Sequence, residues 1–74
     1  MGRTPPITNR VRELRDLQGQ ISQAALGDAI GVTRQTIIAI EQGRYSPSLE
    51  SAFRIANFFG VGLEDVFGWD EGGE

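Results

Sequence analysis

The chain has 74 residues, enough for one small domain, because independently folding domains mostly contain about 50 to 250 residues. Hydrophobic residues make up 39% and charged residues 23%, a globular composition, while the absence of cysteine and histidine excludes disulfides, thiolate zinc sites and histidine chemistry. The net charge of −3 is polarised: residues 1–44 hold six arginines against four acidic residues, whereas residues 45–74 hold one arginine against six. A polyanion would therefore approach the N-terminal half.

Several functional classes are disfavoured. No apolar run approaches the roughly 18 residues that a membrane span needs, and residues 1–6 lack the apolar core of a signal peptide. The sequence also lacks a base-activated nucleophile, a phosphate-binding loop and a metal-ligand cluster. We therefore expect a cytoplasmic protein that is not an enzyme and that needs no metal or cofactor.

The first elements are an arm and a helix. Residues 1–8 hold two of the three prolines and predict a flexible arm. A helical pattern begins at Asn9 and ends at Gly19, with apolar residues at three-residue spacing. Its arginines Arg10 and Arg12 are interpreted as surface charges.

Two further helices follow closely. Ser22 predicts the N-cap of a helix that ends at Gly31, and Thr33 predicts the N-cap of the next, which runs to about Gln42 before Gly43. Serine and threonine are favoured there because their hydroxyl oxygens accept unpaired N–H groups of the first helical turn.

The C-terminal third predicts two more helices. Pro47 fits the first turn of a helix over residues 49–59, capped by Ser46 or Ser48. Its expected apolar face comprises Leu49, Ala52, Phe53, Ile55, Ala56 and Phe59. A short helix over residues 63–67 and an acidic tail over residues 70–74 complete the chain. No strand pattern is evident, so the predicted fold is all-α, with five helices over residues 9–69.

Residues 23–42 fit the outline of a helix-turn-helix, in which two short helices join through a turn that contains glycine. The pattern requires a small residue at Gly27 and a positive φ at Gly31. Its remaining apolar positions are filled in order by Leu26, Ile30, Val32, Ile37 and Ile40.

These residues resemble the helix-turn-helix family of the lambdoid phage repressors and Cro, also called the xenobiotic-response-element type. The resemblance covers Asn9 to Trp69 and is strongest in the stretches Ser22-Gln23, Gly31-Val32-Thr33-Arg34-Gln35-Thr36-Ile37 and Ala39-Ile40-Glu41-Gln42-Gly43. It implies a five-helix lambda-repressor-like domain in a prokaryotic regulator that binds double-stranded DNA and joins the nucleoid when bound.

The resemblance also implies that helix 33–42 enters the major groove. On a helical wheel Gln35 and Ala39 point away from the apolar stripe, and Arg34 at the helix start can swing outward. The expected base contacts are Arg34, Gln35, Ile38 and Ala39, since arginine suits guanine, glutamine suits adenine and apolar groups suit the thymine methyl. The alternative is that Arg34 and Gln35 are solvated surface residues.

Phosphate contacts and one ion pair are implied in the same way. The expected phosphate contacts are Gln23, Thr33, Gln42 and Arg44. Thr33 would cap its helix whether or not DNA is bound, and Arg44 has the alternative of a solubilising charge. Arg15 and Glu41 match positions that form a structural ion pair in the family.

A homodimer is expected through the last two helices. Phe58 lies away from the predicted apolar face, and its expected partners in the interface are Val66, Phe67 and Trp69. The alternative is that the last helix folds back and covers these side chains within one chain.

The favoured function is a sequence-specific transcriptional regulator, acting as a repressor. An antitoxin-like or adaptor protein, with its last two helices bound to a protein partner, is the alternative.

Overall fold

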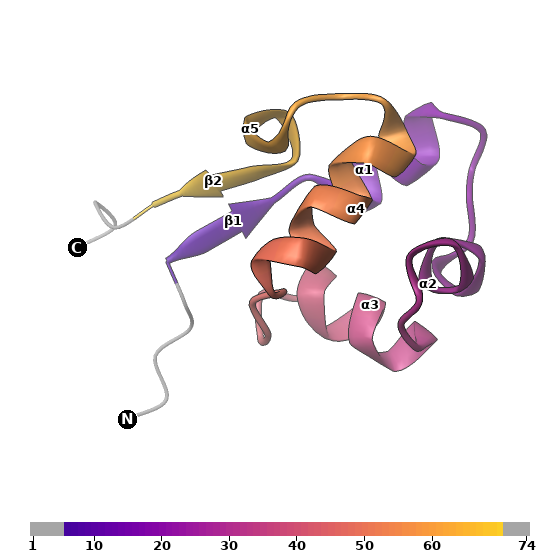
Figure 1. The fold of residues 1–74 in the computed structure, drawn as a ribbon, viewed down its shortest axis with the longest axis horizontal. Coiled ribbons are helices and arrows are strands. Elements are labelled where there is room, and N and C mark those ends of the chain that lie inside the picture. Colours follow the sequence, from indigo (N-terminus) through magenta and orange to yellow (C-terminus); the bar gives the residue numbers. More distant parts are fainter. Residues whose placement is uncertain (1–5, 71–74) are drawn as a thin grey trace.

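The computed structural model describes residues 6–70. The elements of this part are β1 (Ile7–Asn9), α1 (Val11–Leu17), α2 (Gln23–Ile30), α3 (Arg34–Glu41), α4 (Leu49–Phe59), α5 (Leu63–Val66) and β2 (Phe67–Trp69). In Figure 1, α4 crosses the middle of the molecule, with α3 on one side and α5 on the other. The five predicted helices are therefore present.

The fold is not strictly all-α, because the chain forms a two-stranded sheet. Strands β1 and β2 pair in antiparallel register, with Ile7 opposite Trp69 and Asn9 opposite Phe67. The Arg10 N–H donates to the Val66 carbonyl at 2.8 Å, which holds the chain entering α1 beside the chain leaving α5 (Figure 1). Strands of three residues are too short to show an alternating pattern, so the sequence did not reveal them.

The sheet also contains part of the segment assigned to the flexible arm. Ile7 and Thr8 belong to β1, and the Asp70 N–H donates to the Pro6 carbonyl at 2.6 Å. Residues 1–5 of the arm and residues 71–74 of the acidic tail lie outside the described residues.

The helix starts follow the predicted caps. Ser22 and Thr33 accept the N–H groups of the residues three positions ahead, at 2.9 and 3.1 Å. Ser48, rather than Ser46, caps α4 and accepts the Ser51 N–H at 3.1 Å. Pro47 therefore precedes the cap instead of occupying the first turn.

One apolar core joins all five helices. Its members are Val11, Leu14, Leu26, Ile30, Ile37, Ile40, Ile55, Ala56, Phe59 and Val66. Leu49 and Phe53, expected on the core face of α4, are instead 68% and 48% exposed. The reason is that Ala52, Ile55, Ala56 and Phe59 define a narrower buried stripe, and the other two side chains lie beyond its edge.

The turn between α2 and α3 depends on a close backbone approach. A Cβ atom on Gly27 would lie 2.8 Å from the Val32 carbonyl oxygen, and Gly31 has φ +84°. The Gly31 and Val32 N–H groups both donate to the Gly27 carbonyl, at 2.8 and 2.9 Å. Glycine at these two positions therefore fixes the angle at which α3 leaves α2.

Candidate nucleic-acid interface

Helix α3 separates a buried stripe from an exposed one. Ile37 and Ile40 are buried in the core, whereas Arg34 and Gln35 are exposed on the first turn. The other two candidate base contacts, Ile38 and Ala39, are half-buried. The predicted orientation is thus found for Arg34 and Gln35, whereas Ala39, predicted to point away from the core, is half-buried.

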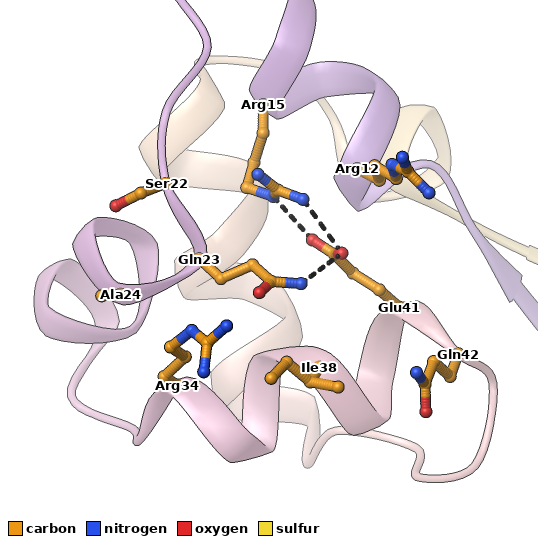
Figure 2. A pocket seen from close by; sticks show the side chains of 9 residues that line it. All are labelled: Arg12, Arg15, Ser22, Gln23, Ala24, Arg34, Ile38, Glu41 and Gln42. Atoms are coloured by element: carbon orange, nitrogen blue, oxygen red, sulfur yellow. Dashed lines mark hydrogen bonds and ion pairs between the residues drawn. The ribbon is translucent and has the colours of Figure 1, made fainter.

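A hollow of about 450 Å³ lies between α1, the start of α2 and α3 (Figure 2). Its lining residues are Arg12, Arg15, Ser22, Gln23, Ala24, Arg34, Ile38, Glu41 and Gln42. The structure thereby gathers two candidate base contacts and two candidate phosphate contacts around one concavity. The other four candidates, Gln35, Ala39, Thr33 and Arg44, are not part of this lining.

The arginines of the described residues divide into two groups. Arg10, Arg15 and Arg54 form ion pairs with Glu13, Glu41 and Glu50. Arg12, Arg34 and Arg44 are exposed and form no ion pair within residues 6–70. These three positive charges lie on or next to the hollow and α3, where they favour the approach of an anion.

Arg12 is exposed, as predicted for a surface charge, and it also lines the hollow opposite Arg34 and Gln42 (Figure 2). Its spacing from Arg15 is the feature of the sequence that indicates this position. Residues three apart share a face of a helix, and Arg15 was already expected to reach toward Glu41.

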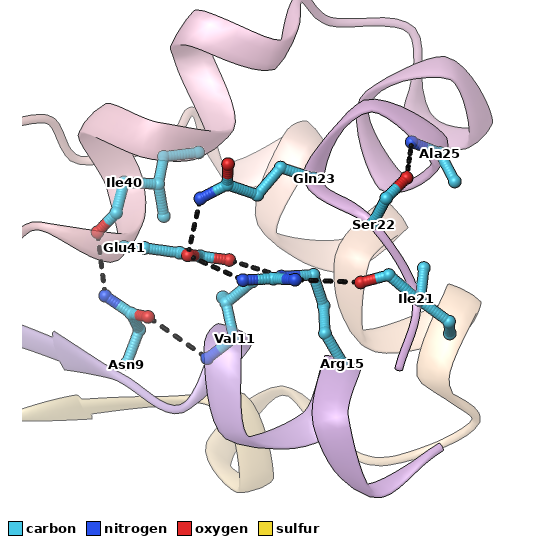
Figure 3. A network of polar contacts seen from close by, with 9 residues as sticks. All are labelled: Asn9, Val11, Arg15, Ile21, Ser22, Gln23, Ala25, Ile40 and Glu41. Carbon is cyan, nitrogen blue, oxygen red and sulfur yellow. Dashed lines mark hydrogen bonds and ion pairs between the residues drawn. The ribbon is translucent and has the colours of Figure 1, made fainter. Parts of the chain in front are cut away.

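Arg15, Glu41 and Gln23, which also line the hollow, form a polar network (Figure 3). Arg15 donates through Nε and a terminal nitrogen to the two oxygens of Glu41, at 2.7 and 3.1 Å, and Gln23 donates to the same carboxylate at 3.1 Å. The two charged side chains are only 11% and 7% exposed. The hydrogen bond to Glu41 raises the pKa of Arg15 above its ordinary value.

This network joins three helices. Arg15 also donates to the Ile21 carbonyl at 2.8 Å, so it contacts the segment before α2 as well as the end of α3. Two parallel bonds between guanidinium and carboxylate restrict direction as well as distance. The end of α3 is therefore held in a defined orientation relative to α1 and α2.

The candidate phosphate contacts differ in their present partners. The Thr33 hydroxyl accepts the Thr36 N–H at 3.1 Å, so it acts as a helix cap in this structure. The amide of Gln23 uses one of its two N–H groups on Glu41. Gln42 and Arg44 are exposed at the end of α3 and after it.

The candidate dimer residues also differ. Phe58 is 38% exposed and packs edge to face on Phe59, with ring centroids 5.2 Å apart. Trp69 is 63% exposed on β2, and Phe67 is half-buried against the core. Val66 is 1% exposed and belongs to the core, because α5 folds back over α4. It is therefore not available to a partner subunit.

Among the helices of residues 6–70, none has the length and apolarity required to cross a membrane.

Comparison with known proteins identifies the family of the helix-turn-helix. A family model described as helix-turn-helix matches residues 11–66. An uncharacterized HTH-type transcriptional regulator of Methanocaldococcus jannaschii is 49% identical over 65 residues, covering 88% of this chain and 97% of the relative. A second such regulator, from Bacillus subtilis, is 51% identical over 65 residues, with the same coverage.

A phage protein is more distantly similar. The cryptic phage CTXphi transcriptional repressor RstR of Vibrio cholerae is 32% identical over 60 residues, which cover 81% of this chain but 53% of the repressor. These similarities do not favour the alternative of an antitoxin-like or adaptor protein.

Proposed function

The chain belongs to the helix-turn-helix family of DNA-binding transcriptional regulators, and from this we propose that it represses transcription by recognising a specific duplex with α3. The observation that supports this best is the position of Arg12, Arg34 and Arg44, which form no ion pair within residues 6–70 and lie around α3. Local positive charge matters more than the net charge of −3, because affinity arises from the phosphates that are neutralised at the interface.

Base recognition is assigned to the exposed side of α3. In the proposed complex Arg34 donates to guanine O6 and N7, and Gln35 pairs with adenine N6 and N7. Ile38 and Ala39 contact thymine methyl groups. These four residues occupy the first two turns of the helix, the part that meets base edges in helix-turn-helix proteins.

The proposed phosphate contacts surround the four base-contacting residues of α3. We assign them to the four residues Gln23, Thr33, Gln42 and Arg44, and we add Arg12 because it lines the hollow opposite Arg34. Gln23 would use its second amide N–H while the first remains bonded to Glu41. Thr33 would use its hydroxyl hydrogen while its oxygen keeps capping α3.

Repression follows from occupancy rather than from catalysis. A protein that occupies a promoter on the nucleoid blocks transcription without chemistry of its own, and we place its action in the cytoplasm. The similarity to a phage transcriptional repressor supports this direction of regulation.

We further propose that the regulator is a homodimer. Phe58, Phe67 and Trp69 form the contact in this proposal, since two of them are exposed aromatic side chains on α4 and β2. A two-fold symmetric contact pairs identical surfaces, so both recognition helices would bind equivalent half-sites about 34–36 Å apart.

Selection from random duplexes, followed by sequencing of the bound fraction, tests this function. We expect an enriched sequence with two-fold symmetry and half-site centres one helical turn apart. The double variant Arg34→Ala/Gln35→Ala serves as the control and should enrich no such sequence. Wild-type protein that enriches no sequence would contradict the proposal.

A further inference from the structure

Asn9 bonds to both α1 and α3. Its side-chain oxygen accepts the Val11 N–H at 3.1 Å, and its side-chain nitrogen donates to the Ile40 carbonyl at 2.8 Å (Figure 3). Arg10 at the N-cap of α1 makes no side-chain cap bond. The Asn9 amide therefore binds an unpaired N–H of the first turn of α1 and a carbonyl of the last turn of α3.

The bond to Ile40 attaches the end of the recognition helix to a part of the chain that is distant in sequence. Asn9 is the last residue of β1, 31 positions before Ile40. The Ile40 carbonyl also accepts the Gly43 N–H at 3.0 Å, so its two lone pairs are both used. The neighbouring residue Glu41 is held by Arg15, which places two successive residues of α3 in contact with the N-terminal part of the chain.

These bonds restrict different motions. The Arg15–Glu41 pair restrains α3 through a side chain, whereas Asn9 binds the backbone of α3 itself. The start of α3 is fixed by the turn after α2, where Val32 donates to the Gly27 carbonyl. The bond from Asn9 consequently acts directly on the backbone at the far end of α3, in addition to the Arg15–Glu41 pair and the buried side chain of Ile40.

We propose that Asn9 is a positioning residue for DNA recognition: its bond to the Ile40 carbonyl holds α3 at the angle at which Arg34 and Gln35 reach base edges. This inference rests on the proposed function. Loss of the bond would reduce discrimination between sequences more than it reduces general affinity, because base contacts require exact direction whereas phosphate contacts tolerate small displacements.

Asn9→Asp keeps the acceptor oxygen of the side chain and removes its N–H donor. The carboxylate still accepts the Val11 N–H, where a negative charge suits the start of α1, but it cannot donate to Ile40. We expect the preference for the selected duplex over a scrambled one to fall about tenfold, which corresponds to about 1.4 kcal/mol of discrimination. The Ile40 carbonyl ¹³C resonance should shift, while the exchange protection of the Val11 amide is kept.

Two further variants complete the test. Asn57→Asp adds the same charge at an exposed α4 residue whose side chain makes no hydrogen bond within residues 6–70, and it should retain the wild-type preference. Asn9→Ser is neutral, keeps an acceptor for Val11 and is too short to reach Ile40, so it decides the matter if Asn9→Asp unfolds.

The outcomes are distinct. A folded Asn9→Ser or Asn9→Asp protein with the same preference as Asn57→Asp would overturn the inference alone. Wild-type protein that binds selected and scrambled duplexes equally would overturn the proposed function, and the inference with it. Reduced preference in the Asn9 variants, with a shifted Ile40 carbonyl, is the result we expect.

Discussion

Arg34 is exposed at the first position of α3 and makes no ion pair within residues 6–70, so its guanidinium can donate to guanine. Glu41, on the last turn of the same helix, is 7% exposed and fully engaged with Arg15 and Gln23. The two ends of α3 thus differ: within residues 6–70 Arg34 carries an unpaired charge, whereas Glu41 is bonded to α1 and α2. Substitutions at the two ends should affect different measurements.

Arg34→Ala should leave the fold intact and cost about 1–3 kcal/mol of discrimination at particular base pairs. The measurement is binding to the selected duplex and to a duplex with 7-deazaguanine at each guanine, which removes the N7 acceptor. We expect one such replacement to weaken the wild type and to leave Arg34→Ala unaffected. Arg44→Ala is the control and should weaken binding to all sequences alike. An Arg34→Ala protein that loses affinity uniformly would show that Arg34 contacts phosphate.

Glu41→Ala should destabilise the protein by about 3–5 kcal/mol, because it leaves the Arg15 charge nearly buried without its partner. Chemical denaturation measures the change. The control is Glu50→Ala, which breaks the Arg54–Glu50 pair, whose side chains are 54% and 74% exposed. Exposed pairs contribute only about 0–1 kcal/mol. Equal losses in the two variants would contradict a structural role for the Arg15–Glu41 pair.

Among the elements, the helix-turn-helix was predictable because each of its positions has a local physical requirement. Ser22 and Thr33 cap their helices, Gly31 supplies the positive φ, and Leu26 and Ile37 are buried as the spacing predicted. Such requirements are short-range in sequence, so one sequence is enough to recognise them.

Apart from the Arg15–Glu41 pair, which the family resemblance implied, features that depend on distant contacts were not predictable. Strands β1 and β2 exist because the two ends of the domain meet, which no three-residue pattern reveals. Val66 was assigned to a subunit interface but is covered within the monomer, and Phe53 was assigned to the core but is 48% exposed. The packing of α1 brings Arg12 beside α3, a position that its spacing from Arg15 alone indicated in the sequence.

The close approach of Gly27 to the turn between α2 and α3 predicts that a larger residue at this position destabilises the protein. Gly27→Ala gains roughly 1 kcal/mol of helix propensity, but its Cβ would lie 2.8 Å from the Val32 carbonyl oxygen, a backbone atom that cannot move without displacing α3. We expect net destabilisation of about 1–3 kcal/mol, as in other overpacked sites, measured by thermal unfolding.

The matched control is Ala29→Gly, at an exposed position of the same helix, which should lose only the propensity difference of about 1 kcal/mol. A Gly27→Ala protein that is more stable than the wild type would show that the turn accommodates a methyl group, and that Gly27 does not set the angle of α3.

At the scale of the molecule, the three unpaired arginines and the exposed aromatic residues of the proposed dimer contact lie on different elements. Arg12, Arg34 and Arg44 lie around α3, whereas Phe58 and Trp69 are carried by α4 and β2. Figure 1 shows α3 and the α5–β2 segment on opposite sides of α4. This separation allows one surface to bind DNA while another contacts a second copy.

Phe58→Glu should convert the proposed dimer into a monomer, because a charge would be buried against apolar neighbours without a partner. Sedimentation measures the assembly, and circular dichroism checks the fold. Phe58 also packs on Phe59 within the monomer, so a stability loss of about 1 kcal/mol is expected as well.

Phe53→Glu makes the same substitution at an exposed phenylalanine of α4 outside the proposed contact, and it should remain dimeric. Wild-type protein that sediments as a monomer at micromolar concentration would contradict a dimer formed without DNA. Dissociation by Phe53→Glu rather than Phe58→Glu would place the contact on the other side of α4.

The most direct test of the central claim, that α3 recognises a specific duplex, is equilibrium binding to the selected duplex and to a scrambled duplex across salt concentrations. We predict a preference of at least about a thousandfold for the selected duplex, with the logarithm of affinity falling linearly with the logarithm of salt concentration. The Arg34→Ala/Gln35→Ala protein should keep the salt dependence and lose the preference. Equal affinity of the wild type for both duplexes, or affinity that does not change with salt, would contradict the claim.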